Sequence, residues 1–137
     1  MLTKLPALDD NEFLNQFESL QLDKDYFNHL GHLRIAWIYL GQHPVDQASI
    51  LVCKGIKAYA ESLGAKDKFS LTVTDSLVRI MAKRRGVIED RSWSRFQRWN
   101  QDLTEHALSV LHQYFTPERL ASNTAKVSLL SPDRNEL

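Results

Sequence analysis

Apolar residues recur at helical spacing along most of the chain. The longer predicted helices end near the few glycines and prolines and cover residues 9–20, 25–41, 44–64 and 69–85. Shorter helices begin at residues 92, 103 and 117, the middle one reaching residue 114. Five glycines and four prolines are too few turn-forming residues for a many-stranded β fold. We therefore expect an all-α fold, a single-domain bundle over residues 1–137 with four to five main helices and short C-terminal helices.

The second predicted helix is apolar on almost every side, which is typical of a central, buried helix. On a helical wheel its polar stripe of His29, His32, Tyr39 and His43, with Ala36 among them, spans about 80°. An imidazole is costly to bury unless it has a hydrogen-bond partner. We therefore expect the stripe to face the inside of the bundle, with Ala36 leaving room beside it.

His29 and His32 lie about one helical turn apart, where two imidazoles could supply two ligands of a zinc, iron or nickel ion. A divalent metal ion is therefore one candidate cofactor, and its third ligand would come from Asp75, His106 or His112. With an open coordination position, such a metal could activate water. The alternative is a pair of structural histidines, hydrogen-bonded to neighbouring side chains or to backbone carbonyls. The residues alone leave both interpretations open.

A polar pocket between the second and fourth helices is the leading functional hypothesis, with a small molecule as its ligand. The candidate ligand-binding residues are His29, His32, Arg34, Trp37, Tyr39, Thr72 and Thr74. Arg34 could instead form a structural salt bridge with Asp75 or Asp25, and the two threonines could instead bond to their own helix. Neither a Gly-rich phosphate loop nor a Gly-x-Ser-x-Gly or Cys-x-x-Cys motif occurs, so nucleophilic catalysis has no support. The sequence does not decide whether the protein is an enzyme.

Charge is distributed unevenly along a chain whose net charge is zero. Residues 1–31 carry a net charge of −4, and residues 79–98 a net charge of +5. The basic segment Arg79–Arg98 also contains Trp93, Phe96 and Trp99. Basic and aromatic residues mixed in this way can bind single-stranded nucleic acid. The same pattern is typical of a solvated basic face whose aromatic side chains turn into the core. Because the whole chain is neutral, we do not expect a nucleic-acid partner. The second functional hypothesis is a non-catalytic module that uses the Arg79–Arg98 face to dock a protein or to self-associate as a homo-oligomer.

The sequence carries no sign of export or of membrane insertion. No apolar run reaches the roughly 18 residues of a membrane helix, and the N-terminus lacks the apolar core of a signal peptide. The single cysteine, Cys53, cannot form an internal disulfide and fits a reducing compartment. We therefore expect a cytoplasmic protein without a membrane partner.

Several motifs resemble those of a family of small, functionally uncharacterised bacterial proteins. The first is Phe27-x-His29-x-x-His32-Leu33-Arg34-x-Ala36-Trp37-x-Tyr39-Leu40. The others lie at residues 68–74, 96–103, 114–122 and 132–133, so the resemblance spans most of the chain. It implies an all-helical fold and, from the recurring histidines of the family, a shared polar or metal site, but it implies no activity.

The resemblance breaks at one motif. Members of the family commonly read Tyr-His-Glu-Thr-x-Thr where this chain has Phe69-Ser70-Leu71-Thr72-Val73-Thr74. If the histidine and glutamate of the family complete a metal site, Ser70 and Leu71 leave this chain without two of its ligands. The candidate residues that remain are His29, His32, Arg34, Trp37, Thr72 and Thr74.

Overall fold

The computed structural model describes residues 5–88 and 92–137, and these form helices and connecting loops, with no strand among them. The longer helices are α1 (Asp10–Glu18), α2 (His29–Leu40), α3 (Val45–Ser62) and α4 (Leu71–Gly86). Shorter helices follow toward the C-terminus: α5 (Trp93–Trp99), α6 (Gln101–Glu105), α7 (Ala107–Leu111), α8 (Pro117–Leu120) and α9 (Asn123–Val127). Single 3-10 turns, η1 (Lys24–Tyr26) and η2 (Lys66–Lys68), precede α2 and α4. The prediction of an all-α fold with several main helices and short C-terminal helices is confirmed.

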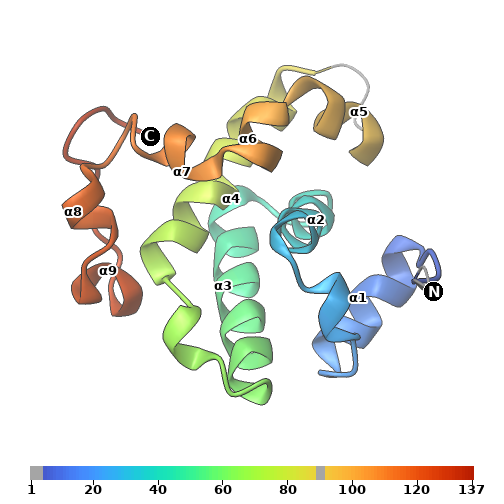
Figure 1. Cartoon of the computed structure of the whole chain (residues 1–137). Coiled ribbons are helices and arrows are strands. Elements are labelled where there is room, and N and C mark those ends of the chain that lie inside the picture. Colours follow the sequence, from blue (N-terminus) through green and yellow to red (C-terminus); the bar gives the residue numbers. More distant parts are fainter. Residues whose placement is uncertain (1–4, 89–91) are drawn as a thin grey trace.

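Helix α2 lies among the other helices, in contact with α1, α3, α4 and α6 (Figure 1). Its side chains Leu33, Ile35, Ala36 and Trp37 are buried in the core. Burying a large apolar side chain stabilises a protein by about 1.5–3 kcal/mol, so α2 contributes strongly to the stability of the fold.

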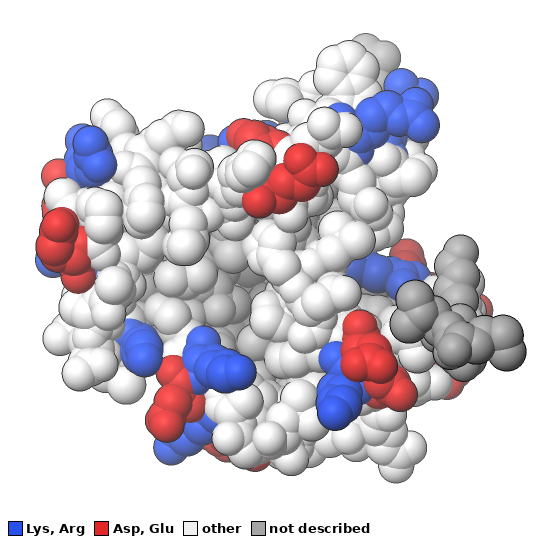
Figure 2. Space-filling view, in the orientation of Figure 1, with Lys and Arg blue, Asp and Glu red and all other residues white. Residues whose placement is uncertain are grey.

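Charged side chains lie mostly toward the edges of the face drawn in Figure 2, around a broad area without them.

The second helix begins later than the sequence predicts, because residues 24–26 form the separate turn η1. The side-chain oxygen of Asn28 accepts a hydrogen bond from the Gly31 amide at 2.8 Å and so caps α2. Gly31 is needed at this bend, since a Cβ on it would lie 1.9 Å from the carbonyl oxygen of Tyr26. His29 and His32 therefore belong to the first turn of α2.

The first turn of α4 is fixed by Ser70, whose hydroxyl accepts a hydrogen bond from the Val73 amide at 3.3 Å. Thr72 therefore lies inside the helix and does not cap it. Its hydroxyl donates to the carbonyl of Ser128 at 2.6 Å and accepts from the amide of Leu130 at 3.1 Å. These bonds hold the C-terminal segment against α4.

The single helix predicted over residues 103–114 is wrong. It is divided into α6 and α7 at His106, whose backbone angles (φ −137°, ψ 47°) lie outside the helical range. The break lets both short helices turn apolar side chains inward, Leu103 from α6 and Val110 and Leu111 from α7.

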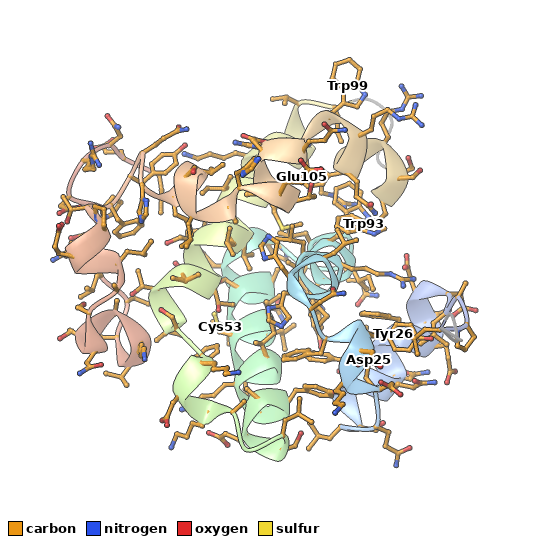
Figure 3. The ribbon with its side chains drawn as sticks, viewed as in Figure 1. Asp25, Tyr26, Cys53, Trp93, Trp99 and Glu105 are labelled. Carbon is orange, nitrogen blue, oxygen red and sulfur yellow. The ribbon has the colours of Figure 1, made fainter. Side chains whose placement is uncertain are left out.

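The aromatic side chains of α5 point in two directions (Figure 3). Trp93 lies near α2, where its ring centroid is 5.8 Å from that of Trp37 and 6.0 Å from that of the buried Phe96. Trp99 points away from the protein and is 68% exposed.

Across residues 5–88 and 92–137, no helix combines the length and the apolar character needed to cross a membrane.

Candidate functional site

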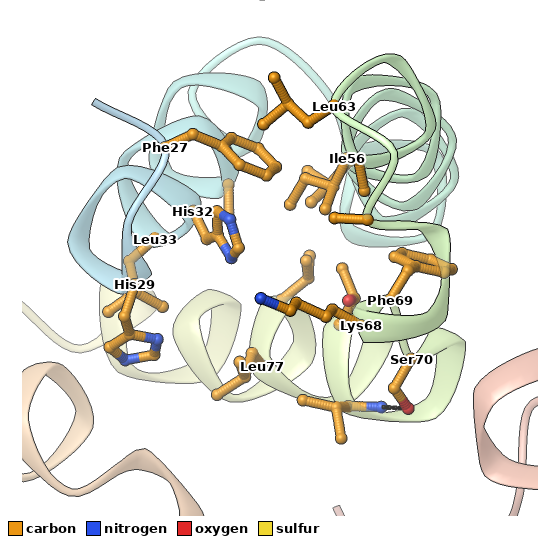
Figure 4. A pocket seen from close by; sticks show the side chains of 17 residues that line it. Phe27, His29, His32, Leu33, Ile56, Leu63, Lys68, Phe69, Ser70 and Leu77 are labelled. Atoms are coloured by element: carbon orange, nitrogen blue, oxygen red, sulfur yellow. Dashed lines mark hydrogen bonds between the residues drawn. The ribbon is translucent and has the colours of Figure 1, made fainter. Parts of the chain in front are cut away.

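A cavity of about 440 Å³ opens between α2, α3, η2 and α4 (Figure 4). We call it the central pocket. Most of its lining is apolar, and the residues are Phe27, His29, His32, Leu33, Ala36, Val52, Ile56, Ala60, Leu63, Ala65, Lys68, Phe69, Ser70, Val73, Thr74, Leu77 and Val78. The cavity lies between the second and fourth helices, where the sequence analysis expects a polar pocket, but its lining is mostly apolar and α3 supplies a further wall.

His32 is the unusual polar group of this pocket. Its ring packs against Phe27, with 4.2 Å between ring centroids, and its Nε2 atom is buried without a hydrogen-bond partner among the described residues. Burial, and secondarily the nearby His29, lowers the pKa of His32 to about 4. The ring is therefore neutral at pH 7, with one nitrogen as a donor and the other as an acceptor. An unsatisfied buried polar atom costs about 1–3 kcal/mol, so Nε2 marks a place where a ligand group would be stabilised.

His29 has a different role from His32 although it is only one turn away. Its Nε2 lies 3.0 Å from the carbonyl oxygen of Leu103 on α6. Because a carbonyl only accepts hydrogen bonds, Nε2 carries the proton and donates it, and Nδ1 is the acceptor when the ring is neutral. His29 thus joins α2 to α6, as the structural interpretation of the histidines predicts, while also lining the pocket.

Polar groups at the α4 side of the pocket come from Lys68, Ser70 and Thr74. Figure 4 shows the Lys68 side chain extending into the opening, with its nitrogen directed toward the interior. The Ser70 hydroxyl is already engaged, since it accepts from the Val73 amide and donates to the Ala125 carbonyl at 3.3 Å. Lys68 is therefore the cation available to a ligand, because its side chain forms no ion pair in the part of the chain that the structure describes.

Of the predicted ligand-binding residues, His29, His32 and Thr74 meet at the pocket, and four others do not line it. Arg34 forms the structural salt bridge that the sequence allowed, but with Asp10 at 3.0 Å and not with Asp75 or Asp25. Its guanidinium also donates to the Leu8 carbonyl at 2.6 Å.

The other three residues contribute to packing. Trp37 packs against Phe96, and the Arg85 guanidinium lies 4.1 Å from the centre of the Trp37 ring. The Tyr39 hydroxyl interacts with Glu18, and burial together with that carboxylate raises the pKa of Tyr39. Thr72 holds the C-terminal segment, as described above.

The part of the chain that the structure describes contains no group of three or more His, Cys, Asp or Glu side chains placed to hold a metal ion. Asp75, a predicted third ligand, instead accepts hydrogen bonds from Ser49 at 2.5 Å and from Arg79 at 3.1 Å. His106 and His112, the other candidates, do not line the pocket. Within residues 5–88 and 92–137, the two pocket histidines therefore have no third ligand of the kind that the metal hypothesis requires.

The sequence analysis missed the contribution of residues 65–70 and of α3 to the pocket wall. The motif at residues 68–74 was the available signal, because Lys68, Phe69, Ser70 and Thr74 all line the pocket. Ser70 and Leu71 are the two positions at which the predicted resemblance breaks. Only the first of these two positions reaches the central pocket.

Two arginines of the Arg79–Arg98 face are paired with aspartates within the chain. Arg79 pairs with Asp75 and with Asp46 at 2.9 Å. Arg84 forms two hydrogen bonds with the Asp102 carboxylate, at 2.8 and 3.0 Å. Residues 89–91 of this face lie outside the described residues. Docking or self-association through this face stays a prediction.

In comparisons with known proteins, no family model, no curated protein and no solved structure matches the chain. The resemblance described from the motifs therefore stays a prediction. The functional argument rests on the geometry of the central pocket.

Proposed function

We propose that the protein binds a small organic molecule in the central pocket, with an apolar body and one hydrogen-bond-accepting group, such as a carboxylate or carbonyl. The observation that carries this proposal is the buried Nε2 of His32, which has no partner among the described residues. A ligand group bonded to the imidazole would remove the cost of leaving it unsatisfied.

The size and lining of the pocket support a small-molecule ligand. Ligand pockets are cavities of roughly 300–1,000 Å³, mostly apolar, with a few polar groups that orient the ligand. The central pocket has a volume of about 440 Å³ and combines aliphatic and aromatic walls with His29, His32, Lys68 and Thr74.

An accepting group on the ligand matches the polar side chains best. Lys68 offers only donors, and the neutral His32 ring donates from Nε2 in the tautomer that carries its proton there. A carboxylate would accept from the imidazole and lie near the positive charge of Lys68, whereas an ammonium group would be repelled by it. The proposal concerns binding, since a histidine with a pKa of about 4 is a weak base at neutral pH.

Calorimetric titration of the full chain with octanoate and with octylammonium tests this proposal, because the two probes share an aliphatic chain and differ in their polar group. We expect octanoate to bind and octylammonium to bind at least tenfold more weakly. The variant His32→Phe removes the N–H, and a hydrogen bond to a charged group contributes about 1.5–3 kcal/mol, so its affinity for octanoate should fall roughly 10- to 100-fold.

Two further variants separate the pocket from general effects of charge. Lys68→Gln should weaken octanoate binding several-fold, whereas Lys83→Gln, an exposed lysine on α4 outside the pocket, should leave it unchanged. Equal affinity of octanoate for the unmodified protein and for His32→Phe would overturn the proposal. So would equal binding of the two probes.

A further inference from the structure

A second cavity, of about 490 Å³, is lined by residues of α3, η2, the start of α4 and α9. Four lysines line it, Lys54 and Lys57 from α3, Lys66 from η2 and Lys126 from α9. We call it the lysine groove. Figure 2 shows both basic and acidic side chains along the lower edge of the molecule, below the position of α9 in Figure 1.

The positive charge of the lysine groove is not matched by acidic side chains. None of the four lysines forms an ion pair within residues 5–88 and 92–137, whereas Arg34, Arg79 and Arg84 each pair with an aspartate. Asp67 is the acidic residue among those that line the groove. Lys126 donates to the main-chain carbonyl of Asp67 at 3.1 Å. The Asp67 carboxylate itself forms no ion pair with a lysine among the described residues. The lining therefore carries a net positive charge, which favours an anion.

The lysine groove also exposes apolar surface beside the ammonium groups. Ile50 from α3 is 66% exposed and Val127 from α9 is 78% exposed, and both line the cavity together with Phe69 and Leu71. Such a combination fits a molecule with an apolar or aromatic body and an anionic group.

The number of lysines distinguishes between anions. A monocarboxylate would offset one of the four positive charges, whereas a phosphate ester carries a charge of about −1.5 to −2 at pH 7 and three acceptor oxygens. Lysine ammonium groups bind phosphate as point charges and do not need the planar geometry of arginine. A phosphate group is therefore the better match.

We propose that the lysine groove binds a small organic phosphate, with its phosphate among Lys54, Lys57, Lys66 and Lys126 and its organic part against the exposed apolar side chains. This site is separate from the proposed carboxylate site, since Phe69 is the one residue that lines both cavities among those described. The inference does not depend on what the central pocket binds.

Calorimetric titration of the full chain with 1-naphthyl phosphate, 1-naphthol and inorganic phosphate tests the proposal. We expect the ester to bind at least tenfold more tightly than either of the other two, because it alone uses both the lysines and the apolar surface. Amide resonances of Ile50, Leu71 and Val127 should shift in nuclear magnetic resonance spectra as the ester is added. Those of Leu33 and Ala36, in the central pocket, should not.

A pair of matched double variants tests the role of the lysines. Lys54→Gln/Lys57→Gln should lower the affinity for 1-naphthyl phosphate at least tenfold, whereas Lys24→Gln/Lys83→Gln removes two exposed lysines outside the groove and should leave it unchanged. Substitutions of exposed side chains usually change stability by no more than about 0.5 kcal/mol, so both variants should fold. Octanoate should bind both of them as it binds the unmodified protein, which separates this test from that of the central pocket.

Several results would overturn the proposal. Equal binding of inorganic phosphate would reduce the groove to a simple anion site, and equal binding of 1-naphthol would remove the role of the lysines. Equal losses in the two double variants would show that only overall charge matters. Dimers in light scattering that dissociate when the ester is added would instead assign the groove to a second copy of the chain. Co-sedimentation with vesicles containing phosphatidic acid, lost in Lys54→Gln/Lys57→Gln, would assign it to a membrane surface.

Discussion

Replacing His32 by phenylalanine tests the central observation, the buried nitrogen without a partner. The substitution keeps a planar aromatic ring and removes both ring nitrogens, and the adjoining cavity of about 440 Å³ leaves room for the larger phenyl group. Because an unsatisfied buried polar atom costs about 1–3 kcal/mol, we expect His32→Phe to raise the free energy of unfolding by about this amount in the absence of ligand.

The expected gain corresponds to a measurable rise in Tm. The entropy of unfolding is about 2.1 cal/mol/K per residue, or about 0.29 kcal/mol/K for a chain of 137 residues. A gain of about 1–3 kcal/mol then raises Tm by about 3–10 °C. Differential scanning calorimetry at pH 7 measures both Tm and the enthalpy of unfolding.

His29→Phe is the matched control, because it makes the same chemical change one turn away. This variant loses the hydrogen bond to the Leu103 carbonyl, and we expect it to be less stable by about 0.5–1.5 kcal/mol. The two variants should therefore shift Tm in opposite directions. A Tm that falls equally in both would show that the His32 ring is satisfied in the folded protein, and the argument for a ligand group at Nε2 would fail.

Three other outcomes follow from the structure. Since burial lowers the pKa of His32 from 6.5 to about 4, the unfolded chain binds more protons between these values, and the free energy of unfolding should fall by up to about 3 kcal/mol as pH drops through this window. Urea denaturation at pH 4–7 measures this slope, which His32→Phe should flatten. Thr72→Val loses its two bonds to residues 128–130, and we expect a loss of about 1–3 kcal/mol with faster amide hydrogen exchange in that segment. Gly31→Ala should destabilise the protein by about 1–3 kcal/mol or more in thermal unfolding, whereas Gly86→Ala, where a Cβ meets nothing within 4 Å, should not.

The main helices could be predicted because their apolar periodicity is strong, but their exact starts depend on competing local bonds. Asn28 caps α2 three residues inside the helix that the periodicity favours, and Ser70 caps α4 one residue after its predicted start at residue 69. The break at His106 could not be found from periodicity, since the apolar residues on both sides still fit helical spacing. Packing against the rest of the fold decides where such a helix divides.

The candidate site could be predicted only in part, because a helical wheel reports direction around the axis and not distance along it. His32 and Tyr39 point in similar directions, yet seven residues place them about 10 Å apart along the helix. His32 therefore lines the central pocket, whereas Tyr39 interacts with Glu18. The sequence does not identify Lys68 as a pocket residue. This lysine lies between two helices, where no helical periodicity indicates the direction of its side chain.

The side chain at residue 70 supports the proposal of an organic ligand, rather than a metal ion, in the central pocket. Ser70 lines the same pocket as His29 and His32, so a histidine at this position would bring a third imidazole to the pocket wall. In this chain the short serine side chain is engaged with the Val73 amide and the Ala125 carbonyl and has no imidazole to offer. Two histidines, one of them bonded to Leu103, do not complete a tetrahedral site. What this lining retains, among the described residues, is an apolar cavity with one unsatisfied imidazole nitrogen and a lysine at its opening, and the proposed carboxylate ligand rests on these two groups.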